Sequence, residues 1–152
     1  MALIIIEKGN WKNTMADFIK TTLSIIDKSG KAIIGSVDKD GYPNLKAMLK
    51  PRKIDGIETF YFTTNTSSMR AGQYKKNPKA AIYFYDARFY RGVMLKGKME
   101  VLEDQKNKNM IWREGDEMYY SKGKTDPDYC VLKFTAESGR LYQNFKSENF
   151  DI

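Results

Sequence analysis

Apolar residues near the start of the chain recur every three or four positions, the spacing of one face of a helix. This spacing extends over residues 14–27, and its apolar positions are Met15, Phe18, Ile19, Leu23 and Ile26. Thr14 and Asp17 have the spacing of a capping box, and Gly30 follows the last apolar position. The pattern therefore predicts a helix over residues 14–27.

Short apolar runs separated by turn residues dominate the rest of the chain. They predict strands over residues 32–37, 44–50, 59–63, 80–85, 93–102, 129–135 and 140–145. Further helices are expected over residues 67–76 and 104–119, and a loop over residues 122–128. Gly97, inside a predicted strand, indicates a bulge or a close approach of another backbone. Many hairpin-linked strands and few helices predict a mostly-β antiparallel barrel with flanking helices, because closure removes exposed strand edges.

The length and composition predict one globular domain over residues 1–152. The chain is 41% hydrophobic and 30% charged, which is typical of a folded domain with its own core. The apolar run over residues 1–6 is too short to span a membrane and has no basic residue before it, so we expect an edge strand or an ordered tail. Cys130 lies in an apolar alternation and is expected to be a buried thiol, which fits a reducing cytoplasm.

The net charge of +7 favours anionic partners: nucleotides, phosphates or nucleic acid. The chain contains no histidine, which excludes Ser-His-Asp and Cys-His catalysis and histidine-bound metals, and its one cysteine excludes a thiolate cluster. We therefore expect a bound organic cofactor to carry any chemistry. A barrel that binds nucleic acid is less favoured, because acidic residues lie among the basic ones and no basic face stands out.

The densest polar segment covers residues 63–70, between a predicted strand and a predicted helix. It combines hydroxyls, an amide and Arg70 at a helix N-terminus, where free backbone N–H groups favour phosphate oxygens. The alternative is that these Thr, Asn and Ser residues only cap a helix that binds nothing. On the strand over residues 44–50, alternation places Lys46, Met48 and Lys50 on one face. A lysine there either reaches the same anion or lies on a solvated exterior.

The order of these segments resembles that of the pyridoxamine 5′-phosphate oxidase-like flavoproteins. The matching segments are residues 41–43 (Gly-Tyr-Pro), 46–48 (Lys-Ala-Met), 61–70 (Tyr-Phe-Thr-Thr-Asn-Thr-Ser-Ser-Met-Arg) and 77–81 (Asn-Pro-Lys-Ala-Ala). Residues 123–129 (Gly-Lys-Thr-Asp-Pro-Asp-Tyr) are similar to the branch called general stress flavoproteins. The resemblance covers residues 18–142, most of the chain, and its ordered set of segments is more specific than any one of them.

The resemblance implies a split β-barrel that forms a homodimer and binds FMN at the interface. Carried over by position, Lys46 matches a family arginine at the FMN phosphate. The other positions that match phosphate contacts are Thr64, Ser68 and Arg70. Thr63 matches a position beside the cofactor, and the backbone of Ala47 and Met48 matches the strand along the flavin ring. Tyr142 falls where the stress branch carries an aromatic residue near the ring.

Several departures from the family pattern bear on function. Lys46 replaces an arginine, so a bidentate fork becomes a point charge. Met69 stands where the oxidase has a second basic residue, and Gly92 where it has a glutamine that contacts the flavin. The segment after Tyr142 lacks a recognisable match to the oxidase's product-binding C-terminus. The residues therefore support phosphate binding better than flavin identity, and both better than vitamin B6 oxidation.

Two functional hypotheses remain open at this point. The first is an FMN-dependent oxidoreductase of the general stress response with an unknown substrate, in which the flavin carries the electrons and no side chain is assigned as acid or base. The second is a non-catalytic flavin carrier or sensor that uses the same residues. A related flavin or a deazaflavin is the alternative cofactor in either case.

Overall fold

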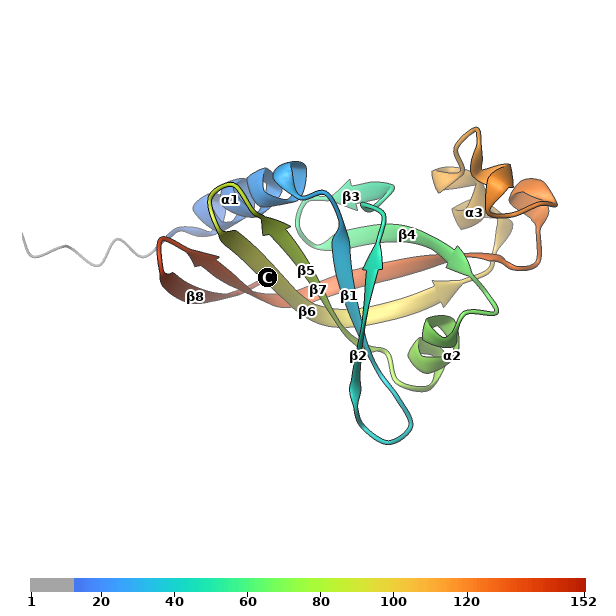
Figure 1. The fold of residues 1–152 in the computed structure, drawn as a ribbon, viewed down its shortest axis with the longest axis horizontal. Helices are drawn as coiled ribbons and strands as arrows, with labels where there is room; N and C mark the ends of the chain where they lie inside the picture. Colours follow the sequence, from blue (N-terminus) through green and yellow to red (C-terminus); the bar gives the residue numbers. More distant parts are fainter. Residues whose placement is uncertain (1–12) are drawn as a thin grey trace, which may run out of the picture.

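A computed structural model of the chain describes residues 13–152 (Figure 1), so the expected edge strand or tail over residues 1–6 lies outside the described residues. The first described helix is α1 (Met15–Lys28), and the predicted capping box is present at its start. The Asp17 N–H donates to Thr14 Oγ1 at 3.2 Å, and the Thr14 N–H donates to the Asp17 carboxylate at 2.8 Å. The buried face is rotated from the predicted one, because Leu23 is 39% exposed while Thr22 is buried.

Eight strands form one antiparallel sheet in the order β2-β1-β5-β6-β7-β4-β3, and β8 pairs with β7. Their bounds are β1 (Ala32–Val37), β2 (Pro43–Met48), β3 (Lys53–Asp55), β4 (Thr59–Asn65), β5 (Lys79–Asp86), β6 (Arg91–Leu102), β7 (Tyr129–Gln143) and β8 (Lys146–Asp151). The long strands β6 and β7 run the length of the molecule, with α1 over one end of the sheet and α2 (Met69–Lys76) at the other (Figure 1). The predicted mostly-β antiparallel architecture with a few flanking helices is confirmed.

The last part of the sheet differs from the prediction. Residues 129–135 and 140–145 do not form two strands, because β7 is continuous across the intervening Glu-Ser-Gly sequence. Pairing with β6 along both halves outweighs the local turn preference, and one extra residue is absorbed in a bulge where the register shifts after Lys96. The turn comes instead at Asn144 and Phe145, which both have positive φ and lead into β8, a strand that was not predicted. The three-residue strand β3 was also not predicted.

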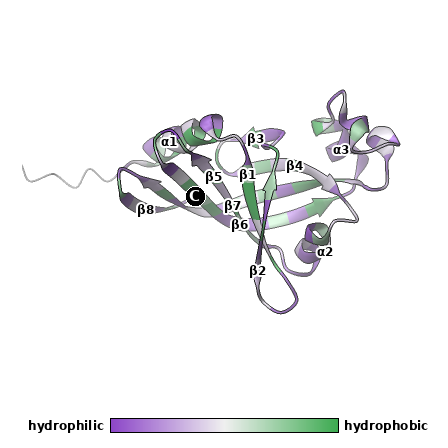
Figure 2. Ribbon diagram, viewed as in Figure 1, coloured by the Kyte–Doolittle hydropathy of each residue, from purple (hydrophilic) through white to green (hydrophobic). Residues whose placement is uncertain are grey.

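Gly97 confirms the expected close approach of backbone. A Cβ at this position would lie 1.9 Å from the carbonyl oxygen of Thr135 on β7, so only glycine allows the two strands to pair here. The main core lies on the inner face of the sheet, where Ile34, Ile82, Phe84 and other buried residues pack beneath α1. Figure 2 shows hydrophobic residues along the central strands and hydrophilic ones at the β1–β2 turn.

The predicted helix over residues 104–119 is wrong beyond Ile111. The helix α3 (Gln105–Ile111) ends there and two short 3₁₀ turns follow, η1 (Asp116–Met118) and η2 (Gly123–Thr125). Gly115 has a φ of +94°, which a continuous helix does not permit, and Met118, expected on the apolar face, is 80% exposed. The predicted loop over residues 122–128 contains η2.

Residues 104–128, here called the α3 segment, pack on a second small core. It joins Ile111 and Tyr120 of that segment to Tyr61 of β4 and to Tyr129 and Val131 of β7. The predicted burial of Cys130 is confirmed, and burial raises the pKa of its thiol. The α3 segment is thus packed on the same end of the sheet as β4 and α2 (Figure 1).

Candidate functional site

A cavity of about 380 Å³ lies where β2, β4, the start of α2 and the α3 segment meet. It brings together six of the eight residues predicted to bind a cofactor: Lys46, Ala47, Met48, Thr63, Thr64 and Arg70. Lys46 and Met48 come from β2, Thr63 and Thr64 from β4, and Arg70 from the first turn of α2. Its volume is in the usual range for a small-molecule site.

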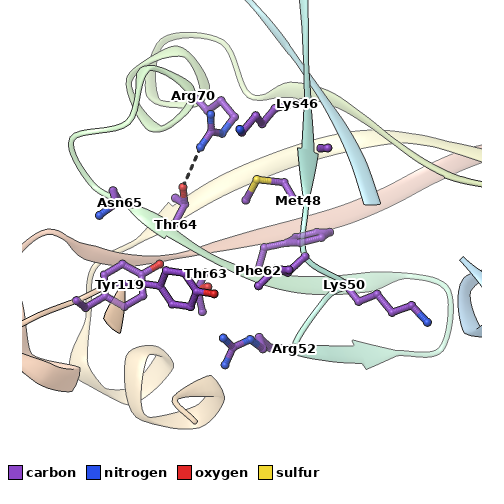
Figure 3. Close-up of a pocket in the computed structure, with 13 residues that line it drawn as sticks. Lys46, Met48, Lys50, Arg52, Phe62, Thr63, Thr64, Asn65, Arg70 and Tyr119 are labelled. Carbon is purple, nitrogen blue, oxygen red and sulfur yellow. Dashed lines mark hydrogen bonds between the residues drawn. The ribbon is translucent and has the colours of Figure 1, made fainter. Parts of the chain in front are cut away.

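One end of the cavity is cationic. Lys46 and Arg70 extend toward one another from β2 and α2 (Figure 3), and Arg70 Nη2 donates to Thr64 Oγ1 over a long 3.4 Å. The Arg70 Nε is buried and has no hydrogen-bond partner within residues 13–152. Of the described residues that line the cavity, none is Asp or Glu. Two cations and a buried unpaired donor fit an anion such as a phosphate.

The opposite end has aromatic and apolar walls. Met48 of β2 and Phe62 of β4 face it from the sheet, and Tyr119 covers it from the α3 segment (Figure 3). Tyr120 of the same segment also lines the cavity. Tyr119 is 55% exposed, whereas Tyr120 is buried, and burial raises the pKa of the Tyr120 hydroxyl. This end therefore fits a flat, mostly apolar group such as a heteroaromatic ring.

An ion pair that the sequence did not reveal fixes this aromatic wall. Arg52 donates to the Asp116 carboxylate through both terminal nitrogens, at 2.9 and 2.7 Å, and both side chains are buried. Burial alone would raise the pKa of Asp116, but the Arg52 guanidinium and the Arg113 N–H outweigh it and hold that pKa below its ordinary value. The pair joins the chain after β2 to η1, so it sets where Tyr119 lies.

Two predicted residues, Ser68 and Tyr142, do not line this cavity. Ser68 is the N-cap of α2, and its Oγ accepts the Ala71 N–H at 3.2 Å, the capping role that was weighed as the alternative for this segment. Tyr142 lies near the end of β7, where that strand pairs with β8, away from the β4 and α2 end (Figure 1). Its ring is 6.2 Å from that of Tyr90, centroid to centroid. The phosphate and ring roles of these two residues stay predictions.

Comparisons with known proteins agree with the fold. The family model described as pyridoxamine 5′-phosphate oxidase matches residues 18–143. A Clostridium acetobutylicum protein related to general stress protein 26, of the pyridoxinephosphate oxidase family, is 40% identical, with a TM-score of 0.80 over 89% of this chain and 94% of that one. A pyridoxamine 5′-phosphate oxidase-related, FMN-binding protein of Nostoc punctiforme has the same fold, with a TM-score of 0.69 at 14% identity over 93% and 98% of the two chains. These structures confirm the predicted split β-barrel.

Curated relatives match a smaller part of the chain. The pyridoxine/pyridoxamine 5′-phosphate oxidase of Legionella pneumophila strain Lens is 32% identical over 77 residues, which are 49% of this chain and 34% of that enzyme. The corresponding enzyme of Wolbachia pipientis wMel is 28% identical over 122 residues, 70% of this chain and 56% of that enzyme. The chain thus spans between a third and about half of the length of these oxidases.

Proposed function

The chain belongs to the pyridoxamine 5′-phosphate oxidase family, and we propose that it binds FMN with the phosphate held by Lys46, Thr64 and Arg70. The observation that carries this proposal is the cationic end of the cavity, where the buried Arg70 Nε has no partner within the described residues. A phosphate oxygen would supply the missing acceptor, and Lys46 would add a second charge. The flavin ring would then lie along the backbone of Ala47 and Met48, beside Thr63.

We further propose that the holoprotein is an FMN-dependent oxidoreductase. When bound, FMN supplies the electron transfer, and the side chains of the cavity bind it, orient it and exclude water. The described lining contains no carboxylate and the sequence no histidine to act as a general base, and burial raises the pKa of the Tyr120 hydroxyl. The 40% identity to a protein related to general stress protein 26 supports a role in the stress response.

The first experiment is a titration of the purified protein with FMN and, in parallel, with riboflavin, followed by flavin absorbance and fluorescence quenching. We expect saturation near one FMN per chain and much weaker binding of riboflavin, because only FMN has the phosphate. Equal affinities for the two flavins would contradict the phosphate site. Tight binding of a phosphorylated deazaflavin with no binding of FMN would keep the site and change the cofactor.

A homodimer is proposed from the outer face of the sheet, opposite the core. The register places Ala47, Ile33 and Tyr83 side by side across β2, β1 and β5, and Leu45 lies on the same face, 75% exposed. An apolar sheet face of this kind is typical of an interface between subunits. Tyr142 lies on this face as well, since it pairs with Gly92 of β6, whose other neighbour is Tyr85. A second copy would therefore bring its Tyr142 into the interface, where the family places an aromatic residue near the ring.

The oligomeric state is measured by sedimentation equilibrium at several protein concentrations. We expect the mass of a dimer for the wild type and of a monomer for Leu45→Glu, because the variant would bury a charge in the interface. Lys39→Glu is the control: it lies in the exposed β1–β2 turn, changes the charge by two units against one for Leu45→Glu, and should still leave the mass unchanged. A monomeric wild type would contradict the proposal.

A further inference from the structure

The loop between β4 and α2 is held in place by a residue far away in the sequence. Asp128 Oδ1 accepts the Ser67 N–H at 2.8 Å, and Asp128 Oδ2 accepts the Asn65 Nδ2 at 2.9 Å. Its carbonyl oxygen also accepts the Thr66 N–H at 2.8 Å. Three successive residues, the last of β4 and the first two of the loop, thus donate to the residue just before β7.

We propose that Asp128 is the positioning residue of the phosphate end, and that it sets the selectivity of the cavity for FMN over riboflavin. The loop it holds lies between Thr64 and Arg70, the two residues whose side chains meet at 3.4 Å in the cavity. Both must converge on the same phosphate, and a free loop would let their spacing vary. The inference rests on the proposed function, because it requires that the cationic end bind a phosphate.

Asp128, the last residue of the α3 segment, is itself fixed by other residues of that segment. Its N–H donates to Asp126 Oδ1 at 2.9 Å, and the other oxygen of that carboxylate accepts the Lys122 N–H at 3.0 Å. The Asp126 carbonyl oxygen accepts the Nζ of the buried Lys108 of α3 at 3.1 Å. Asp128 is therefore held by hydrogen bonds within the α3 segment. A residue that is itself fixed in this way can hold the loop, and the binding groups next to it, in one geometry.

Two physical effects of Asp128 oppose one another. Its negative charge would repel a phosphate, whereas its hydrogen bonds order the loop that binds one. The carboxylate is not among the cavity-lining residues, and both of its oxygens point to loop donors. Hydrogen bonds from Ser67 and then Asn65 lower the pKa of Asp128, so the acceptor stays ionised at neutral pH. We infer that the ordering effect is the larger one.

The test compares the FMN-to-riboflavin affinity ratio of the full chain with that of Asp128→Ala and Asp128→Asn. If Asp128 had a merely structural role, its loss would reduce the affinities for FMN and riboflavin by the same factor and leave their ratio unchanged. A positioning role should lower the ratio about tenfold in the alanine variant, which is the effect of losing one or two hydrogen bonds from the loop. Asparagine keeps an acceptor for the Ser67 N–H but places its own NH₂ group against that of Asn65. The affinity ratio of Asp128→Asn should therefore fall between those of the wild type and Asp128→Ala.

Asp104→Ala is the matched control. Asp104 also accepts hydrogen bonds from a backbone N–H and an asparagine side chain, both of Asn107, but it caps α3 and does not line the cavity. Its ratio should equal that of the wild type. An unchanged or higher ratio in both Asp128 variants would overturn the inference while FMN selectivity of the wild type still stood. Equal binding of both flavins by the wild type would instead contradict the phosphate site. If the alanine variant does not fold, the asparagine variant decides.

Discussion

Replacing Arg70 with alanine tests the cationic end of the cavity most directly. The change removes a guanidinium that donates only one long bond, to Thr64 at 3.4 Å, and whose Nε is buried without a partner in the described part of the chain. A hydrogen bond to a charged group contributes about 1.5–3 kcal/mol. At about 1.4 kcal/mol for each tenfold change, FMN should bind about 10- to 100-fold more weakly. Lysine at this position keeps the charge without the planar fork, so the FMN affinity of Arg70→Lys should lie between those of the wild type and Arg70→Ala.

The effect of Arg70 on the empty protein should have the opposite sign. A buried donor without an acceptor costs free energy, so Arg70→Ala should leave the protein without FMN at least as resistant to urea as the wild type. Quenching titrations with FMN and riboflavin, together with urea unfolding of the ligand-free variant, measure both effects. An unchanged FMN affinity would remove Arg70 from the site. A matching loss of riboflavin affinity would show that the residue acts on the ring or on folding.

Two further substitutions test the framework of the site. Asp116→Asn should reduce the free energy of unfolding by about 3–5 kcal/mol at neutral pH, because it leaves the buried Arg52 unpaired. Since the folded state lowers the pKa of Asp116 below its ordinary 3.8, the contribution of the carboxylate is present above about pH 4 and is lost as the pH falls below it. The difference between variant and wild type in urea unfolding should therefore narrow on acidification, and a constant difference would refute the charge argument. Gly97→Ala should lower stability by about 1–3 kcal/mol or more, because its Cβ meets the Thr135 carbonyl at 1.9 Å. Gly30→Ala, whose Cβ has no neighbour within 4 Å, should have little effect in the same thermal unfolding measurement.

The parts of the fold that the sequence predicted are those with local causes. The capping box of Thr14 and Asp17 needs only residues three apart, and the strands follow from alternation over a few positions. The polar segment over residues 63–70 was predicted as a strand-to-helix junction because its composition favours one, and α2 begins within it. Six of the eight predicted binding residues line one cavity because β2 and β4 end there and α2 begins there.

The parts that the sequence did not predict depend on contacts between distant residues. The end of helix α3 after Ile111 is stabilised by Asp116, whose carboxylate accepts a hydrogen bond from Arg52, 64 residues earlier in the sequence. Continuous β7 follows from pairing with β6, which overrides a local Glu-Ser-Gly turn preference. Asp128 carried a signal only as part of the segment resembling the stress branch, and its role in holding the loop depends on contacts with residues about 60 positions away. Contacts between such distant residues leave no periodic pattern or fixed spacing in a single sequence, so they could not be predicted from it.

The chemistry available to the site follows from what its walls contain. Lys46 and Arg70 lie at one end, the aromatic side chains lie at the other, and no carboxylate lines the cavity within the described residues. Arg52 and Lys50 also line the cavity, but Arg52 is paired with Asp116, and Lys50 Nζ donates to the Asp27 carbonyl oxygen at 2.8 Å. The cavity can therefore bind and orient a phosphorylated ring, and its described lining places no carboxylate and no histidine beside that ring. Selection of a reaction partner would then fall to Tyr119, the exposed part of the wall, whose position depends on the Arg52–Asp116 pair. For this reason a change at Asp116 should alter which molecules react with the flavin before it alters whether the flavin binds.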